Sequence, residues 1–123
     1  MKLLLIGVFG VLGVYARYFI QQGFSRSWES PFPTGTFVIN LLGSFLIGLL
    51  LAVFAARSSL SQDLKVALGV GFLGGFTTFS AYSFESLQLF QEARYTVLAL
   101  YWVGSPVLGL LATLGGWELG KLV

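Results

Sequence analysis

Hydroxyl and aromatic side chains are concentrated in one apolar segment, which runs from Gly71 to Glu85 and reads GFLGGFTTFSAYSFE. In the hydrocarbon of a membrane, a polar group without a partner costs several kcal/mol, so such a segment persists only where protein or a watery cavity surrounds it. We therefore interpret this segment as the working part of the chain. Its chemistry is that of neutral hydrogen-bond donors and ring edges, and the sequence indicates no catalytic residues.

The spacing within this segment arranges the two kinds of side chain separately. Hydroxyls recur at every third position, at Thr77, Ser80 and Ser83. Rings recur in the same way, at Phe76, Phe79 and Tyr82. On a continuous helix, residues three apart are neighbours, so we expect a ladder of hydroxyls on one flank and a ladder of rings on the adjoining flank.

The glycine pair Gly74 and Gly75, followed by Thr77 and Thr78, favours an interruption of the helix. The spacing of the hydroxyls by itself favours a milder outcome, a bend, because a threonine can bond back to the carbonyl four residues earlier. A true break would free carbonyl oxygens at mid-membrane. Freed carbonyls are the ligands that unwound transporter segments offer to a hard cation such as sodium.

Polar residues in other apolar stretches add further donors. The amide of Asn40 lies within VINLLG and must find partners, either as structural glue between helices or as part of a pore lining. Tyr101 and Ser105 are four residues apart and hence on one helix face, with Thr113 further along. Glu85 is the one acid well inside an apolar stretch. Because donors dominate this set, the pattern favours an anion as the ligand.

The elements that position these residues are expected to be membrane helices. The chain has 123 residues, of which 56% are hydrophobic and only 10% are charged, whereas soluble domains carry roughly 25% charged residues. About 20 apolar residues cross a bilayer as a helix, and four stretches meet this length: 3–22, 36–56, 64–90 and 95–119. The sequence predicts an all-α membrane protein with a single domain over residues 1–123, in which the third of four spans is broken.

The first stretch is expected to be retained rather than cleaved as a signal peptide, because its apolar run is too long for a signal core and ends in Arg17. The chain contains neither cysteine nor histidine. It therefore has no disulfides, no thiolate metal site and no histidine proton shuttle. We expect neither enzymatic activity nor a nucleic-acid partner.

Basic residues are almost evenly divided between the two membrane sides that four spans imply. One side carries Lys2, Arg57, Lys65 and Lys121, and the other carries Arg17, Arg26 and Arg94. Orientation follows the excess of Lys and Arg on the cytoplasmic side, and four against three is almost no excess. Either a partner or the insertion machinery decides the orientation, or both orientations are made and pair as an antiparallel homodimer. We favour the dual-topology homodimer.

Three motifs make the chain similar to the Fluc (CrcB) family of fluoride channels over essentially its whole length. The first stretch has Gly10, Gly13, Arg17 and Tyr18 in the arrangement G-x-x-G-x-x-x-R-Y. The second has Gly35-Thr36 ahead of the segment VINL at 38–41. The most specific match is GFLGGFTTFS at 71–80, which resembles the family signature G-F-x-G-G-x-T-T-F-S.

This resemblance implies an antiparallel, dual-topology homodimer with two pores that conduct fluoride passively out of a bacterial cytoplasm through the inner membrane. The pore and fluoride-binding residues would be Asn40, Phe79, Ser80, Tyr82, Ser83, Tyr101, Ser105 and Thr113. Arg17 would flank a vestibule, and Glu85 would be the acid just past the aromatic motif. The backbone carbonyls of Gly74 and Thr77 would hold a structural sodium ion at the dimer centre.

Two positions depart from the family pattern. Tyr82 occupies a position that is usually phenylalanine, and its hydroxyl can itself donate a hydrogen bond. Gly109 occupies a position where a serine is often found, which removes one hydroxyl from the fourth span.

Two other functions are compatible with four apolar spans. A small proton-coupled exporter of the multidrug-resistance type has this size, but its chemistry needs a carboxylate in the first span, and residues 3–22 contain none. Glu85 is the acid through which proton coupling would have to work. In an assembly subunit without transport activity, the polar residues would serve only as helix glue.

Overall fold

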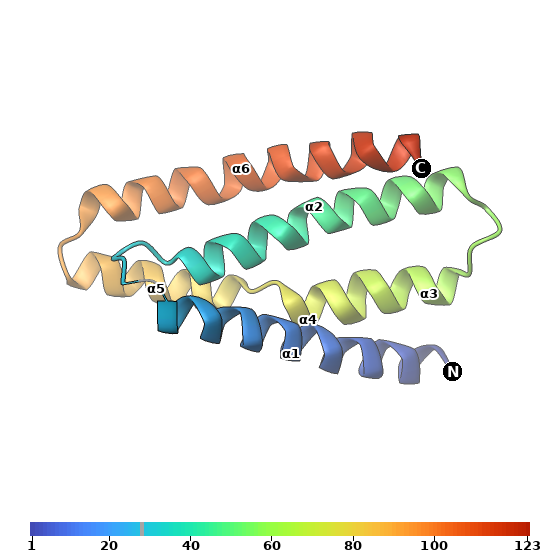
Figure 1. The fold of residues 1–123 in the computed structure, drawn as a ribbon, viewed down its shortest axis with the longest axis horizontal. Coiled ribbons are helices and arrows are strands. Elements are labelled where there is room, and N and C mark those ends of the chain that lie inside the picture. The colour runs from blue at the N-terminus through green and yellow to red at the C-terminus, as the bar shows by residue number, and fades with distance from the viewer. Residues whose placement is uncertain (28) are drawn as a thin grey trace.

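The computed structural model describes residues 1–27 and 29–123. All of its long elements are helices (Figure 1). Helix α1 covers Lys2–Ser27, α2 covers Thr34–Ala56 and α6 covers Tyr95–Leu122. The third span consists of α3 (Gln62–Val66), η1 (Ala67–Leu73), α4 (Gly74–Phe76) and α5 (Phe79–Gln91). Within the described ranges, four helices are long and apolar enough to cross a membrane. The four predicted spans are confirmed, and the first continues about a turn beyond Gln22.

The four spans alternate in direction, so that the chain termini and the connection between α2 and α3 lie at one end of the bundle (Figure 1). The closest helix pairs are not neighbours in sequence. Helix α2 packs most extensively against α6, and α1 packs against η1 and α4. Both pairs are parallel, because each joins spans that cross in the same direction. The bundle is therefore held together by contacts that skip one span.

Both parallel pairs meet backbone to backbone at glycines. A Cβ atom on Gly13 of α1 would clash with the carbonyl oxygen of Phe72 in η1. A Cβ atom on Gly48 of α2 would clash in the same way with the carbonyl oxygen of Thr113 in α6. Lipid tails are as apolar as a helix surface, so helices in a membrane associate through such close packing rather than through the hydrophobic effect.

The third span departs from α-helix geometry twice. Residues Ala67–Leu73 form a π-helix, which the sequence does not predict. Four residues later the helix is broken: Thr77 has φ −80° and ψ 157°, and Thr78 has φ −149° and ψ 118°. The predicted break is therefore confirmed, and it occurs at the threonines rather than at Gly74 and Gly75, which stay helical.

The two predicted ladders are wrong in their first members because the break separates them from α5. The Thr77 hydroxyl bonds back to the carbonyl of Leu73 at 2.9 Å, and the ring of Phe76 stacks on Phe72 with centroids 5.8 Å apart. Only the members within α5 keep helical spacing, namely Ser80 and Ser83 for the hydroxyls and Phe79 and Tyr82 for the rings.

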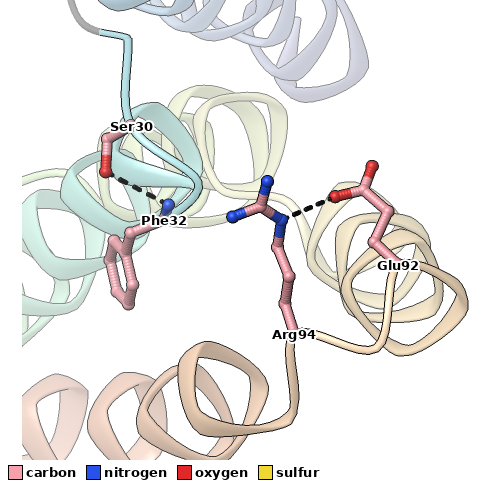
Figure 2. A network of polar contacts seen from close by, with 4 residues as sticks. All are labelled: Ser30, Phe32, Glu92 and Arg94. Atoms are coloured by element: carbon pink, nitrogen blue, oxygen red, sulfur yellow. Dashed lines mark hydrogen bonds and ion pairs between the residues drawn. The ribbon is translucent and has the colours of Figure 1, made fainter.

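The end of the bundle opposite the termini is closed by two short connections, which Figure 2 shows together. In the connection before α2, the N–H of Phe32 donates to Ser30 Oγ at 3.2 Å. In the connection between α5 and α6, Arg94 Nε donates to Glu92 Oε2 at 3.0 Å. The ring of Phe32 packs edge-on against Tyr101, with centroids 5.4 Å apart. This contact joins the first connection to the buried aromatic core.

We expect Gly13→Ala to lower the free energy of unfolding by about 1–3 kcal/mol, because the added methyl forces α1 away from the carbonyl of Phe72. Gly7→Ala is the matched control on the same helix, since a Cβ there meets nothing within 4 Å. Thermal unfolding in detergent, followed by circular dichroism, measures both. Equal midpoints for the two variants would contradict the close contact between α1 and η1.

Candidate functional site

The break in the third span is held by one side chain of α2. Asn40 Nδ2 donates to the carbonyl of Thr78 at 3.0 Å, and Asn40 Oδ1 accepts from the N–H of Thr78 at 2.9 Å. A primary amide presents a donor and an acceptor side by side, so it replaces both hydrogen bonds that an extended residue loses. The sequence left open whether Asn40 is glue or pore lining. The structure places its amide on the broken backbone.

The break releases the two carbonyls that the resemblance assigns to a cation. In a continuous helix the carbonyl of Gly74 would accept from the N–H of Thr78, which instead donates to Asn40. The carbonyl of Thr77 would accept from the N–H of Ala81, which instead donates to Thr78 Oγ1 at 3.2 Å. Both oxygens have therefore lost their helical donors, and they are hard ligands of the kind that sodium prefers.

An open groove of about 400 Å³ runs past the break between α2 and the third span. Its lining includes Asn40, Ser44, Gly74, Thr77 and Phe79. The ring of Phe79 is 79% exposed although it lies at the start of a membrane helix segment. The groove thus combines the predicted carbonyl ligands with the predicted pore amide and the first pore ring.

A second polar cluster surrounds Glu85 and draws one residue from each span. Thr36 Oγ1 of α2 donates to Glu85 Oε1 at 2.5 Å, and the hydroxyl of Tyr101 on α6 donates to Glu85 Oε2 at 2.7 Å. Gln21 Nε2 of α1 donates to Thr36 Oγ1 at 3.2 Å. Thr36 and Tyr101 are almost completely buried. Each carboxylate oxygen is therefore paired with a hydroxyl at the place where the four spans meet.

Aromatic rings connect the groove to this cluster. The ring centroids of Phe79 and Tyr82 are 5.8 Å apart, and those of Tyr82 and Tyr101 are 4.7 Å apart. Tyr82 and Ser83 also line a second open cavity, of about 640 Å³, together with Trp102 of α6. Ring edges carry partial positive charge, so rings of this kind can make weak favourable contacts with an anion.

The remaining predicted hydroxyls differ in how they are bonded. Ser83 Oγ donates to the carbonyl of Phe79 at 3.0 Å, and Thr113 Oγ1 donates to the carbonyl of Gly109 at 3.0 Å. Ser80 Oγ lies 3.3 Å from Thr78 Oγ1. Among the buried side-chain polar atoms of the residues that the structure describes, Ser105 Oγ is the one found without a hydrogen-bond partner. Of this group, Ser105 thus has a hydroxyl whose hydrogen-bonding capacity is unused within the chain.

Gly109, which departs from the family pattern, lies next to a hydroxyl of α2. A Cβ atom on Gly109 would lie 3.5 Å from Ser44 Oγ of α2. Ser44 also lines the groove, so α2 supplies a hydroxyl beside the position where α6 lacks one.

Arg17 lies outside both clusters, in a cleft of about 280 Å³ on α1 that also includes Tyr18, Gln21 and Gln22. The structure thus separates the predicted residues into three neighbouring regions. Asn40, Phe79, Gly74 and Thr77 share the groove, Glu85 and Tyr101 share the buried cluster, and Arg17 marks the cleft.

The sequence reasoning missed Thr36, Thr78 and Gln21 as site residues. A signal was present for Thr36, because it precedes Asn40 by four residues and therefore lies on the same face of α2. For Thr78 the signal was the need of Asn40 for a partner with both a donor and an acceptor. Nothing in the spacing within α1 relates Gln21 to a residue of another helix.

Comparison with known proteins gives one family and a consistent set of relatives. Residues 4–117 match the family described as CrcB-like protein, Camphor Resistance (CrcB). A protein of Nitratidesulfovibrio vulgaris named fluoride-specific ion channel FluC is 42% identical over 122 residues, covering 99% of this chain and 98% of its own length. Proteins of the same name from Oceanobacillus iheyensis and Geobacter sulfurreducens are 44% and 39% identical, each covering 93% of this chain and 88% and 92% of their own lengths.

We expect Asn40→Leu to lower the free energy of unfolding by about 2–4 kcal/mol, because it leaves both backbone groups of Thr78 without partners. Asn40→Asp keeps the acceptor for the N–H of Thr78 but sets a negatively charged oxygen against the carbonyl of Thr78, so it is expected to be destabilised as well. Denaturant unfolding in detergent measures both. A leucine variant as stable as the parent would show that the break does not depend on this amide.

Proposed function

This chain belongs to the CrcB family, and we propose that it is a channel, not an enzyme, that lets fluoride leave a bacterial cytoplasm through the inner membrane. The observation that carries the proposal is the groove in which the Asn40 amide holds the broken third span beside the exposed ring of Phe79. The names of the relatives, each a fluoride-specific ion channel, support the same function.

The chemistry of this groove suits a small anion that holds its water tightly. A narrow apolar path must replace that hydration at several closely spaced, weak sites so that the ion can both bind and leave. Amide N–H groups, hydroxyls and ring edges provide such sites without a full positive charge that would trap the ion. A larger halide matches closely spaced donors less well, which favours fluoride over chloride.

We assign the path to the residues around the groove and the chain of rings. In this proposal the pore is formed by Asn40, Phe79, Ser80, Tyr82, Ser83, Tyr101, Ser105 and Thr113. Arg17 attracts anions at the mouth of the pore. Glu85 flanks the pore, and its carboxylate accepts hydrogen bonds from two hydroxyls. Tyr82 contributes a ring edge and, in addition, a hydroxyl that can donate a hydrogen bond.

The proposed assembly is an antiparallel homodimer with dual topology. A single chain leaves the groove open and Phe79 mostly exposed, which a second copy across a two-fold axis would cover. The near balance of basic residues, four against three, supports insertion in both orientations. Two copies related in this way would enclose two equivalent paths.

A structural sodium ion fits the centre of this assembly. The carbonyls of Gly74 and Thr77 lie at the groove without their helical donors, and the two-fold axis would bring both pairs together. When bound, the ion would supply a fixed positive charge between the two anion paths. The residues of this chain would hold it through backbone oxygens alone.

We expect purified protein in liposomes to release fluoride but not chloride, and Phe79→Ile to reduce the fluoride flux at least tenfold, because isoleucine has no positive ring edge. Phe84→Ile is the matched control, since Phe84 is also exposed on α5 and lies outside the proposed path. Asn40→Asp is expected to reduce the flux as well, because it replaces a donor with a negative charge. A fluoride electrode records the fluoride fluxes, and a chloride electrode records the chloride control.

Three outcomes of this experiment would contradict the proposal. Liposomes that pass no anion would favour an assembly subunit without transport activity. Fluoride driven uphill by a pH gradient would favour a proton-coupled exporter working through Glu85. Variants that conduct like the parent would show that Asn40 and Phe79 lie outside the path.

We expect replacement of sodium by a bulky organic cation throughout purification to weaken the dimer and reduce the flux, because the facing carbonyls then lose their counter-charge. Chemical crosslinking in detergent, together with flux from sodium-free liposomes, measures the two effects. Unchanged crosslinking and unchanged flux would contradict a structural sodium ion.

A further inference from the structure

We propose that Gln21 of α1 is a positioning residue for the channel. It orients the hydroxyl of Thr36 so that this hydroxyl stays hydrogen-bonded to the carboxylate of Glu85. The proposal rests on the proposed function, because its effect is an effect on anion passage. Gln21 does not belong to any of the motifs that relate this chain to its family, and it is the only member of the Glu85 cluster on the first span among the described residues.

The direction of the hydrogen bonds follows from the atoms present. An ionised carboxylate has no proton to give, so both hydroxyls around Glu85 must donate to it. The hydroxyl of Thr36 has a single proton, which is thereby committed to Glu85. Its oxygen can still accept, and Gln21 Nε2 donates to it at 3.2 Å. Gln21 therefore holds Thr36 in the one orientation that serves the carboxylate.

The consequence for an anion comes from the position of Glu85. Its partner Tyr101 is also the ring that contacts Tyr82 in the proposed path. A carboxylate bound by two hydroxyls repels a passing anion less than a free one, since its charge is shared with two donors. If Thr36 turns away, Glu85 Oε1 loses its donor, and the carboxylate next to Tyr101 then carries more unshared charge.

The cavities around Gln21 support this role. Gln21 lines the Arg17 cleft, and it also lines a smaller cavity of about 160 Å³ that reaches Thr36 and Glu85. The same side chain thus lies between the arginine that attracts anions and the carboxylate that repels them. Gln21 thus connects α1, the most exposed span, to the buried hydroxyl of Thr36.

Gln21→Met tests the proposal, because methionine keeps the length and volume of glutamine but cannot donate to Thr36. We expect its fluoride flux in liposomes to fall roughly threefold to tenfold at pH 7.5, the effect of one lost hydrogen bond. Gln88→Met is the matched control, since Gln88 is exposed on α5 and lies outside the cavities described above, and its flux is expected to equal that of the parent.

The Glu85→Gln background separates positioning from simple structural damage. Glutamine carries no charge at this position, so adding Gln21→Met to Glu85→Gln should leave the flux equal to that of Glu85→Gln alone. Structural damage would lower the flux by the same factor in both backgrounds.

A Gln21→Met flux equal to that of Gln88→Met, or a loss that persists undiminished in the Glu85→Gln background, would overturn the proposal. If Gln21→Met fails to fold, Gln21→Glu decides instead, because it has the same shape and competes with Glu85 for the proton of Thr36. A reduced flux in Gln21→Glu supports the proposal and a parental flux overturns it. A parent protein that conducts no fluoride would contradict the proposed function itself, which distinguishes the two failures.

Discussion

The structure depends on a pair of hydrogen bonds between the Asn40 amide and the backbone of Thr78. A membrane helix cannot be broken unless the freed backbone groups find partners, because no water is available in hydrocarbon to take their place. One side chain meets this requirement here from the neighbouring span. Once the break is satisfied at Thr78, the carbonyls of Gly74 and Thr77 lose their helical donors and α5 begins with Phe79 directed into the groove. The candidate cation ligands and the first pore ring follow from this single constraint.

Helix α2 organises both polar clusters with residues one turn apart. Asn40 holds the break, and Thr36, four residues earlier, holds the carboxylate of Glu85. The position of α2 is itself fixed by its contact with α6, where Gly48 admits the backbone of Thr113. A small displacement between these two helices would therefore affect the break and the carboxylate together, since both are held by side chains of the same helix face.

Most of the fold could be predicted from sequence because hydropathy and span length constrain it directly. The four spans and the break after Gly75 are of this kind. The predicted ladders of hydroxyls and rings were wrong at Thr77 and Phe76, because residues three apart share a helix face only when the helix between them is unbroken. The π-helix at Ala67–Leu73 and the bond between Gln21 and Thr36 were not predictable, since they depend on which spans pack together. Asn40 lies between these cases: its need for a partner was predictable, but the identity of Thr78 as that partner was not.

The pairing of α2 with α6 has a consequence for biogenesis. A nascent chain leaves the ribosome in order, so the second transmembrane segment is inserted before the fourth has been translated. Its main intramolecular partner does not yet exist, and the glycine surface of α2 must meanwhile be covered by lipid, by the translocon or by another polypeptide. In the same way, the first segment is inserted before the third segment, against which it packs, has been translated. Assembly of the complete bundle is therefore a late event, which follows release of the last segment into the bilayer.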